Sequence, residues 1–218
     1  MTVNDKTELV WSELALTLSR KFKCETGVGL SDDHLKFIYS LIPTKSYPID
    51  YNNEKISWEQ FSKIKLNKRE FTFWQWFNSI MVLTRDVLCD LWNNGLIIGF
   101  ISSEDSQRIL SICEDETFLL RFSESFLGSI SINFVKNGQF MKLAPYNASD
   151  LKAYSLPNCI RILKAVKYLY PNTPKDEAFG SYYTKIDPVN SVTPFPYTLA
   201  DRLLVARLRN EQIQIDEQ

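Results

Sequence analysis

The sequence has few of the residues on which catalysis and metal binding usually depend. Its 218 residues include one histidine, four cysteines and seven glycines. A single histidine excludes metal sites and reaction mechanisms that need two imidazoles. Any mechanism that needs one imidazole would have to use His34. So few glycines also speak against a glycine-rich loop that binds phosphate. We therefore expect that the chain is not an enzyme and has no cofactor.

The four cysteines are widely spaced and form no Cys-x-x-Cys pair. This spacing is typical of neither a zinc site nor a disulfide framework, so we expect four free thiols that serve as small apolar side chains in a reducing compartment. The first residues lack the basic and then apolar run of a signal peptide, and the apolar stretch 96–101 is much shorter than the ~20 residues of a membrane span. The sequence predicts a protein of the cytosol or nucleus that makes no membrane contact.

The chain also lacks an excess of charge of either sign. Its 25 basic and 26 acidic residues give a formal net charge of -1 at pH 7. A protein that binds nucleic acid on its own usually has a basic face, so autonomous DNA binding is not expected. Apolar residues make up 44% of the chain, which is enough for a core in one large or two modest domains.

Hydrophobic periodicity predicts a helical first half and a mixed second half, an α+β fold. The predicted helices cover residues 10–22, 34–42, 57–61, 72–93, 106–112 and 155–169, and the predicted strands cover 117–122, 129–135 and 140–143. Lys136-Asn137-Gly138-Gln139 has the composition of a hairpin turn between the last two strands. His34 stands just past a helix start, where we expect a partly exposed surface side chain.

The segment Thr117 to Ser125 carries the clearest chemical signal. A strand that is apolar on both faces belongs in the middle of a sheet, so we expect Arg121 to be buried. A guanidinium cannot lose its charge, and its burial therefore requires an anionic partner. That partner is either a carboxylate of this chain or a phosphate, which the hydroxyls of Ser123 and Ser125 and the N–H groups of the following turn would also bind.

Residues 117–125, Thr-Phe-Leu-Leu-Arg-Phe-Ser-Glu-Ser, resemble the phosphotyrosine-binding strand and loop of a Src homology 2 (SH2) domain. The form is that of the STAT family, the signal transducers and activators of transcription. Residues 71–77 are similar to the aromatic signature of the STAT linker domain, residues 91–102 to its junction with the SH2 domain, and residues 168–179 to the end of that domain. These matches follow one another along the chain in the same order as the corresponding segments of STAT proteins.

The resemblance implies a domain organisation. It gives a leader at residues 1–9, a helical linker domain at 10–93, an SH2 domain at 94–183 with a small central antiparallel sheet flanked by helices, and an extended C-terminal tail at 184–218. STATs normally have an amino-terminal domain, a coiled coil and a DNA-binding barrel before the linker, and the ten or so residues ahead of Trp11 cannot hold them. DNA is therefore expected as a partner only in a longer form.

The resemblance also implies site residues. Arg121 would hold the phosphate in a bidentate manner, Ser123 and Ser125 would donate hydroxyls, and Glu124 would contribute mainly its backbone. STAT pockets usually carry a lysine at the position of Ser103. Its loss leaves two alternatives.

The first alternative is weaker or altered phosphate binding, because Glu104 and Asp105 follow Ser103. The second is that Lys142, on the opposite strand, replaces the missing cation.

In this family a Janus-type kinase phosphorylates a tail tyrosine, and each subunit's tail enters the pocket of the other. The expected phosphorylation site is Tyr197, 18 positions after Phe179 (197 − 179), with Tyr182 and Tyr183 as alternatives. Residues 199–208 have helical spacing, unlike the extended tails usual in the family.

The expected partners are phosphotyrosine peptides of receptors and of a second STAT-type chain, a tyrosine kinase, and a second copy in a homodimer formed on phosphorylation. The chain is expected to move from cytoplasm to nucleus on activation. The alternative is a truncated adaptor or dominant-negative short form that binds phosphotyrosine without binding DNA.

Overall fold

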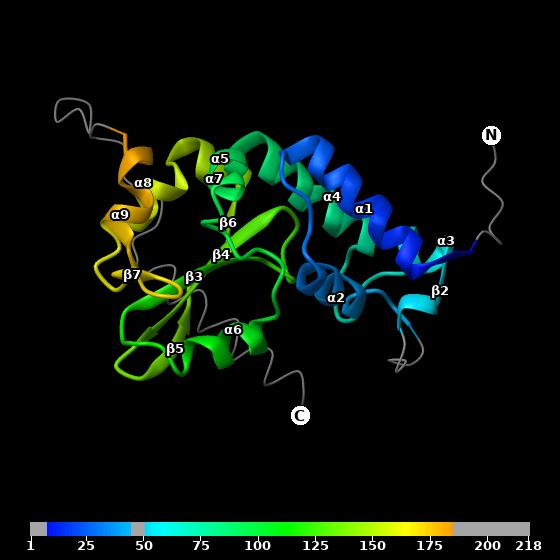
Figure 1. Cartoon of the computed structure of the whole chain (residues 1–218), viewed down its shortest axis with the longest axis horizontal. Helices are drawn as coiled ribbons and strands as arrows, with labels where there is room; N and C mark the ends of the chain where they lie inside the picture. Colours follow the sequence, from blue (N-terminus) through cyan, green and yellow to red (C-terminus); the bar gives the residue numbers. More distant parts are fainter. Residues whose placement is uncertain (1–7, 45–50, 185–218) are drawn as a thin grey trace. The chain divides into compact units, whose positions relative to one another are not determined.

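The computed structural model describes residues 8–44 and 51–184. The chain forms two compact units (Figure 1). Among the described residues, the first comprises 8–44, 51–102 and 122–129, and the second comprises 103–121 and 130–184. The boundary crosses strand β3 (Thr117–Phe122) between its last two residues. Within the described ranges, no helix is both long enough and apolar enough to span a membrane.

The first unit is mainly helical. Its elements are β1 (Glu8–Val10), α1 (Trp11–Thr26), α2 (Asp32–Ser40), η1 (Tyr51–Asn53), β2 (Lys55–Ser57), α3 (Trp58–Ser62), α4 (Phe73–Leu83), η2 (Thr84–Leu88) and α5 (Cys89–Asn93). β1 and β2 form a short antiparallel pair. α4, the π-helical turn η2 and α5 follow one another without a break, which confirms the helix predicted over residues 72–93.

Among the described helices of this unit, α2, α3 and α4 begin with a capping box. In each, a hydroxyl accepts the backbone N–H three residues later, and the side chain at that position accepts the N–H of the capping residue. The pairs are Ser31 with His34 before α2, Ser57 with Gln60 before α3, and Thr72 with Gln75 before α4. Ser57 and Gln60 have the spacing of a capping box in the sequence, and the same chemistry fixes the starts of α2 and α4.

Aromatic rings fill the core of the first unit. The ring centroid of Phe100 lies 4.9 Å from that of Phe122, 5.9 Å from that of Trp76 and 5.5 Å from that of Phe22. Gly99, at φ 78°, permits this approach, because a Cβ there would lie 2.8 Å from Cζ3 of Trp92. The last residue of β3 is therefore part of this aromatic core.

The second unit is built around a six-stranded sheet. Besides β3, its elements are α6 (Ser103–Leu110), β4 (Ser129–Lys136), β5 (Gln139–Lys142), β6 (Tyr146–Asn147), α7 (Ala148–Ala153), α8 (Leu156–Ile162), β7 (Tyr168–Leu169), β8 (Thr173–Pro174), α9 (Lys175–Phe179) and η3 (Gly180–Tyr182). The strand order is β5-β4-β3-β7-β8, with β6 paired to β4. The three predicted strands and the α+β class are confirmed.

The β4–β5 hairpin has the predicted turn. Asn137 and Gly138 have φ values of 53° and 70°, and Lys136 pairs with Gln139. Positive φ at both central residues gives a turn whose twist matches that of the flanking strands. The Asn-Gly sequence therefore sets the register in which Asn133 lies opposite Lys142.

The helix predicted over residues 155–169 is wrong in its second half. α8 ends at Ile162, and Tyr168–Leu169 instead form β7, which pairs in parallel with β3. The apolar residues keep a helical spacing past Ile162. An extended segment can instead form backbone hydrogen bonds with the edge of β3, which a helical segment cannot do. Lys175 favours the early helix end, because its ammonium donates to the carbonyls of Ile160 (3.2 Å) and Leu163 (2.7 Å).

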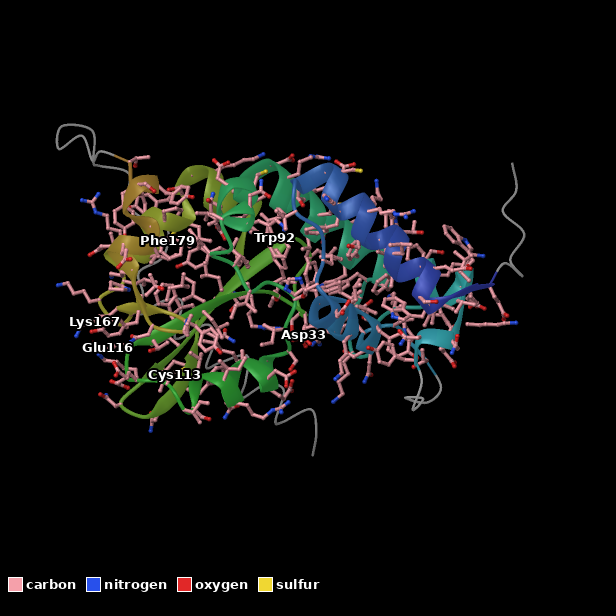
Figure 2. The ribbon with its side chains drawn as sticks, in the orientation of Figure 1. Asp33, Trp92, Cys113, Glu116, Lys167 and Phe179 are labelled. Atoms are coloured by element: carbon pink, nitrogen blue, oxygen red, sulfur yellow. The ribbon has the colours of Figure 1, made fainter. Side chains whose placement is uncertain are left out.

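Glu116 joins the three central strands at their shared end. It has φ 69°, its N–H donates to the carbonyl of Val135, and its own carbonyl accepts the N–H of Lys167. Its carboxylate pairs with the ammonium groups of Lys136 and Lys167, and Figure 2 shows the side chains of Glu116 and Lys167 side by side. The hydrogen bonds from Lys136 and Lys167 lower the pKa of the Glu116 carboxyl.

All four cysteines are free thiols, as expected, but only Cys159 is buried as a small apolar side chain would be. Cys89 and Cys113 are half-buried, and Cys24 is exposed. The periodicity of α1 explains Cys24, because the buried face of that helix includes Leu18 and Phe22 and leaves position 24 on the opposite side.

His34 is partly exposed, as expected, but its ring also contacts the aromatic core. The ring centroid lies 5.5 Å from that of Trp92 and 5.7 Å from that of Phe100, and Nδ1 accepts the N–H of Ser31 at 3.2 Å. Burial of the ring lowers the pKa of His34, and a hydrogen bond with the backbone of Ile98 and the charge of Asp33 oppose this shift. The neutral imidazole is therefore the form that the folded chain prefers.

We predict that acidification from pH ~7 through the ordinary histidine pKa of ~6.5 destabilises the chain. In this window the unfolded chain takes up a proton that folded His34 resists, and each unit of lowered pKa corresponds to about 1.4 kcal/mol. His34→Gln should remove this pH dependence and keep the capping box, as Gln60 and Gln75 do. Urea unfolding at about pH 7.5 and about pH 5.5 measures the effect. An equal loss of stability in both proteins would contradict the prediction.

Candidate functional site

The residues predicted to bind phosphate lie in four places. Arg121 is the fifth residue of β3, Lys142 ends β5, Ser103 begins α6, and Ser123, Glu124 and Ser125 occupy the loop after β3. Arg121, Lys142 and Ser103 belong to the second unit, and the three loop residues belong to the first. Tyr197 lies outside the described residues.

Arg121 is buried, as predicted, with 5% of its surface exposed. β3 lies between β4 and β7, and each of its six residues is buried. Because a guanidinium stays charged at every accessible pH, this position brings a permanent positive charge into the centre of the sheet. A buried cation of this kind is stable only beside anionic or strongly polar groups.

A chain of buried polar groups joins β4 to the first turn of α6. The hydroxyl of Ser131 donates to Oδ1 of Asn133 at 3.2 Å, and Nδ2 of Asn133 donates to Oγ of Ser106 at 2.8 Å. Oγ of Ser106 in turn donates to the carbonyl of Ser103 at 2.8 Å. Asn133 is also in register with Lys142. This series of hydrogen bonds and the strand pairing therefore fix both Ser103 and Lys142 relative to β4.

Ser123 organises the loop that follows β3. It is buried, and its Oγ accepts the backbone N–H groups of Ser125 and Phe126, each at 3.2 Å. Its own N–H donates to the carbonyl of Ser129 at 2.8 Å. The oxygen of this hydroxyl is thus used as an acceptor, whereas the hydroxyl proton can still be donated. Ser125 is exposed and Glu124 is half-buried.

Three side chains from residues 69–79 contact the backbone of this loop. The indole N–H of Trp76 donates to the carbonyl of Ser123 at 2.8 Å. Nε of Arg69 donates to the carbonyl of Glu124 at 3.1 Å, and Oγ of Ser79 accepts the N–H of Gly128 at 2.7 Å. The loop therefore belongs to the helical unit rather than to the sheet whose central strand it follows.

Two family models match the chain. The linker domain of signal transducers and activators of transcription matches residues 1–77, and the SH2 domain matches residues 96–163. The chain is 41% identical over 182 residues to signal transducer and activator of transcription 6 of Homo sapiens, and this match covers 79% of the chain. It is 38% identical over 186 residues to a signal transducer and transcription activator of Drosophila melanogaster, covering 81% of the chain. The chain belongs to the STAT family.

The matched relatives are much longer proteins. The STAT linker and SH2 sequence described here corresponds to 22% of the human relative and 24% of the Drosophila relative. The predicted domain boundaries within it stay predictions. Among solved structures, the inactive choanoflagellate E3 ubiquitin ligase Cbl TKB aligns with 89% of this chain and 52% of its own at 16% identity, with a TM-score of 0.33, which adds nothing to the assignment.

Sequence reasoning missed two groups of side chains in this STAT segment. The polar chain through Ser131 and Asn133 has a detectable signal, because polar and apolar residues alternate along Ser129-Ile130-Ser131-Ile132-Asn133-Phe134. The contacts of Arg69, Trp76 and Ser79 leave no detectable signal in the sequence, because they join positions 47 to 55 residues apart. Within the described ranges, no group of three or more His, Cys, Asp or Glu side chains is placed to hold a metal ion.

Proposed function

We propose that the chain is the phosphotyrosine-binding part of a STAT-type transcription factor, which tyrosine phosphorylation activates by reciprocal binding of tail and pocket between two copies. One observation carries this proposal: a buried arginine on the central strand of a sheet that leads, one residue later, into a Ser-Glu-Ser loop inside the region that matches the SH2 domain. The proposed setting is cytokine or Janus-kinase signalling, with movement from cytoplasm to nucleus on activation. DNA would bind only to a longer form with the upstream domains.

Phosphotyrosine fits the chemistry of these residues. A phosphate monoester brings about -1.5 to -2 charges and three strong acceptor oxygens at neutral pH. The planar guanidinium of Arg121 can donate two parallel N–H bonds to such a group, and the hydroxyls of Ser123 and Ser125 can add further donors. A carboxylate offers fewer acceptor oxygens and less charge, so the site would favour the phosphorylated side chain over an acidic one.

Tyr197 is the proposed phosphorylation site, and the surroundings of Tyr183 support this choice. The hydroxyl of Tyr183 donates to the Asp176 carboxylate at 2.8 Å, and the guanidinium of Arg161 lies 5.2 Å from the ring centroid. Burial, together with the hydrogen bond to Asp176, raises the pKa of Tyr183. A phosphate on Tyr183 would face the negative charge of Asp176, whereas 18 extended residues from Phe179 to Tyr197 can reach at most ~60 Å.

Arg121→Ala should weaken binding of a phosphorylated peptide of residues 193–203 by about 100-fold or more, because loss of one partner of a buried charge pair costs roughly 3–5 kcal/mol. Isothermal titration measures the affinity. Arg121→Lys, which keeps the charge and loses the bidentate geometry, should bind with intermediate affinity. Arg108→Ala, which removes an exposed arginine from α6, is the matched control and should bind like wild type. Unchanged affinity in Arg121→Ala would reject the assignment.

Lys142→Ala tests whether Lys142 supplies the second cation. We expect an affinity for the same phosphopeptide about three- to tenfold lower and a shallower dependence on salt, because one charge contact is lost. Lys152→Ala, an exposed lysine on α7, is the control. In the converse variant, Ser103→Lys should raise the affinity. If Lys142→Ala and Lys152→Ala bind alike, Lys142 has no such role.

Tyr197→Phe should abolish dimer formation on phosphorylation. After treatment with a tyrosine kinase, the wild-type chain should sediment as a dimer, in which each tail–pocket contact occurs twice, and the variant should stay monomeric. Tyr182→Phe serves as the control and should still dimerise. A dimer that persists in Tyr197→Phe and disappears in Tyr182→Phe would move the phosphorylation site to Tyr182.

A further inference from the structure

The loop after β3 has both ends attached to one short segment of the helical unit. At the start of the loop, the carbonyl of Ser123 accepts the indole N–H of Trp76, and the carbonyl of Glu124 accepts Nε–H of Arg69. At the end of the loop, the N–H of Gly128 donates to Oγ of Ser79. Between these points Phe126 and Leu127 are exposed, with 36% and 44% of their surface accessible.

Trp76, the central residue of this segment, is tightly packed. Trp76 is fully buried, with its ring centroid 6.3 Å from that of Phe37 and 5.9 Å from that of Phe100. It lies in the first turns of α4, whose start is fixed by the Thr72 capping box. A buried indole that donates its N–H has little freedom to move, so the carbonyl of Ser123 has a fixed partner.

Ser79 and Gly128 meet closely. Oγ of Ser79 donates to the carbonyl of Trp76 at 2.7 Å while it accepts the N–H of Gly128, so one hydroxyl links the helix to the loop. Gly128 has φ 50°, and a Cβ there would lie 3.1 Å from the carbonyl oxygen of Ser79. A glycine is thus suited both to the backbone conformation and to the close approach.

We propose that Arg69, Trp76 and Ser79 are positioning residues for phosphotyrosine binding. They hold the Ser123–Gly128 backbone in the conformation in which Ser123 Oγ gathers the N–H groups of Ser125 and Phe126. A loop that is already ordered loses less conformational entropy when a ligand binds, and its donors stay aimed at one place. The proposal rests on the function proposed above and adds that the linker-type helices are part of the phosphotyrosine reader.

Ser79→Ala in the full chain is the sharpest test, because it removes one hydroxyl from a half-buried position. The matched control is Ser40→Ala, since Oγ of Ser40 makes the same bond to the carbonyl three residues earlier, at 2.6 Å to Phe37, and is exposed. Two quantities are measured: hydrogen exchange of the Gly128 amide in the free chain, and affinity for the phosphorylated 193–203 peptide. We expect exchange about tenfold faster and affinity about three- to tenfold lower in Ser79→Ala alone.

A double-mutant cycle separates positioning from a general effect on stability. If Ser79 acts through the loop, the effects of Ser79→Ala and Ser125→Ala on affinity are not additive, whereas a general loss of stability leaves them additive. The amides of Leu119 and Leu120 in β3 should exchange at the wild-type rate in Ser79→Ala. A faster Gly128 amide with coupled effects on affinity supports the proposal.

Two contrary results differ in what they overturn. If the wild-type chain binds the phosphopeptide and Ser79→Ala binds it equally well, the positioning role is overturned and the proposed function stands. If the wild-type chain does not bind the phosphopeptide, the proposed function is overturned and the positioning role with it. Additive effects in the double-mutant cycle overturn the positioning role alone.

Discussion

The burial of one permanent charge is the constraint on which the rest of the site depends. Arg121 is placed on the central strand by a sequence that is apolar on both sides of it, and 95% of its surface is withdrawn from solvent. A carboxylate or an ammonium group could respond to such a position by losing its charge, but a guanidinium cannot. The surrounding structure must therefore supply polar and anionic groups, and a phosphate monoester supplies both in one ligand.

Separate parts of the sequence position the other residues that were predicted to bind phosphate. On the sheet, the hairpin turn sets Lys142 opposite Asn133, and Asn133 is linked through Ser106 to the start of α6. Beyond the strand, the loop is shaped by Ser123 and attached to α4 through Trp76 and Ser79. In this STAT-family chain, the backbone of the loop after β3 depends on side chains of the helical unit to which the loop itself belongs.

Local rules predict most of the fold. Capping chemistry at Ser57 and Gln60, the Asn-Gly turn and the two-sided apolar strand are each encoded within a few neighbouring residues, and the structure contains all three. The segment around Tyr168 shows where local rules fail. Its apolar spacing suits a helix, but the open edge of β3 and the ammonium of Lys175 end the helix early. Pairing with a distant strand edge is a tertiary effect that helical periodicity does not contain.

In the candidate site too, some features follow from neighbouring residues and others depend on contacts between distant residues. The burial of Arg121 and the hydroxyls beside it follow from the strand pattern and the residues next to it. The contacts of Trp76 and Arg69 with the loop join residues about fifty positions apart, and no spacing rule links an indole N–H to one particular carbonyl. Cys24 shows a related limit, because cysteine is commonly buried but the helical phase of α1 places this one in solvent.

We propose that the guanidinium of Arg121 binds the phosphate, and the most direct measurement observes that group. The full chain, labelled with 15N in its arginine side chains, is titrated with the 193–203 peptide phosphorylated at Tyr197 and, separately, with the unphosphorylated peptide. The Nε–H resonance of Arg121, assigned by its absence in Arg121→Lys, should shift only with the phosphorylated peptide. A phosphopeptide that binds without moving this resonance would contradict the account.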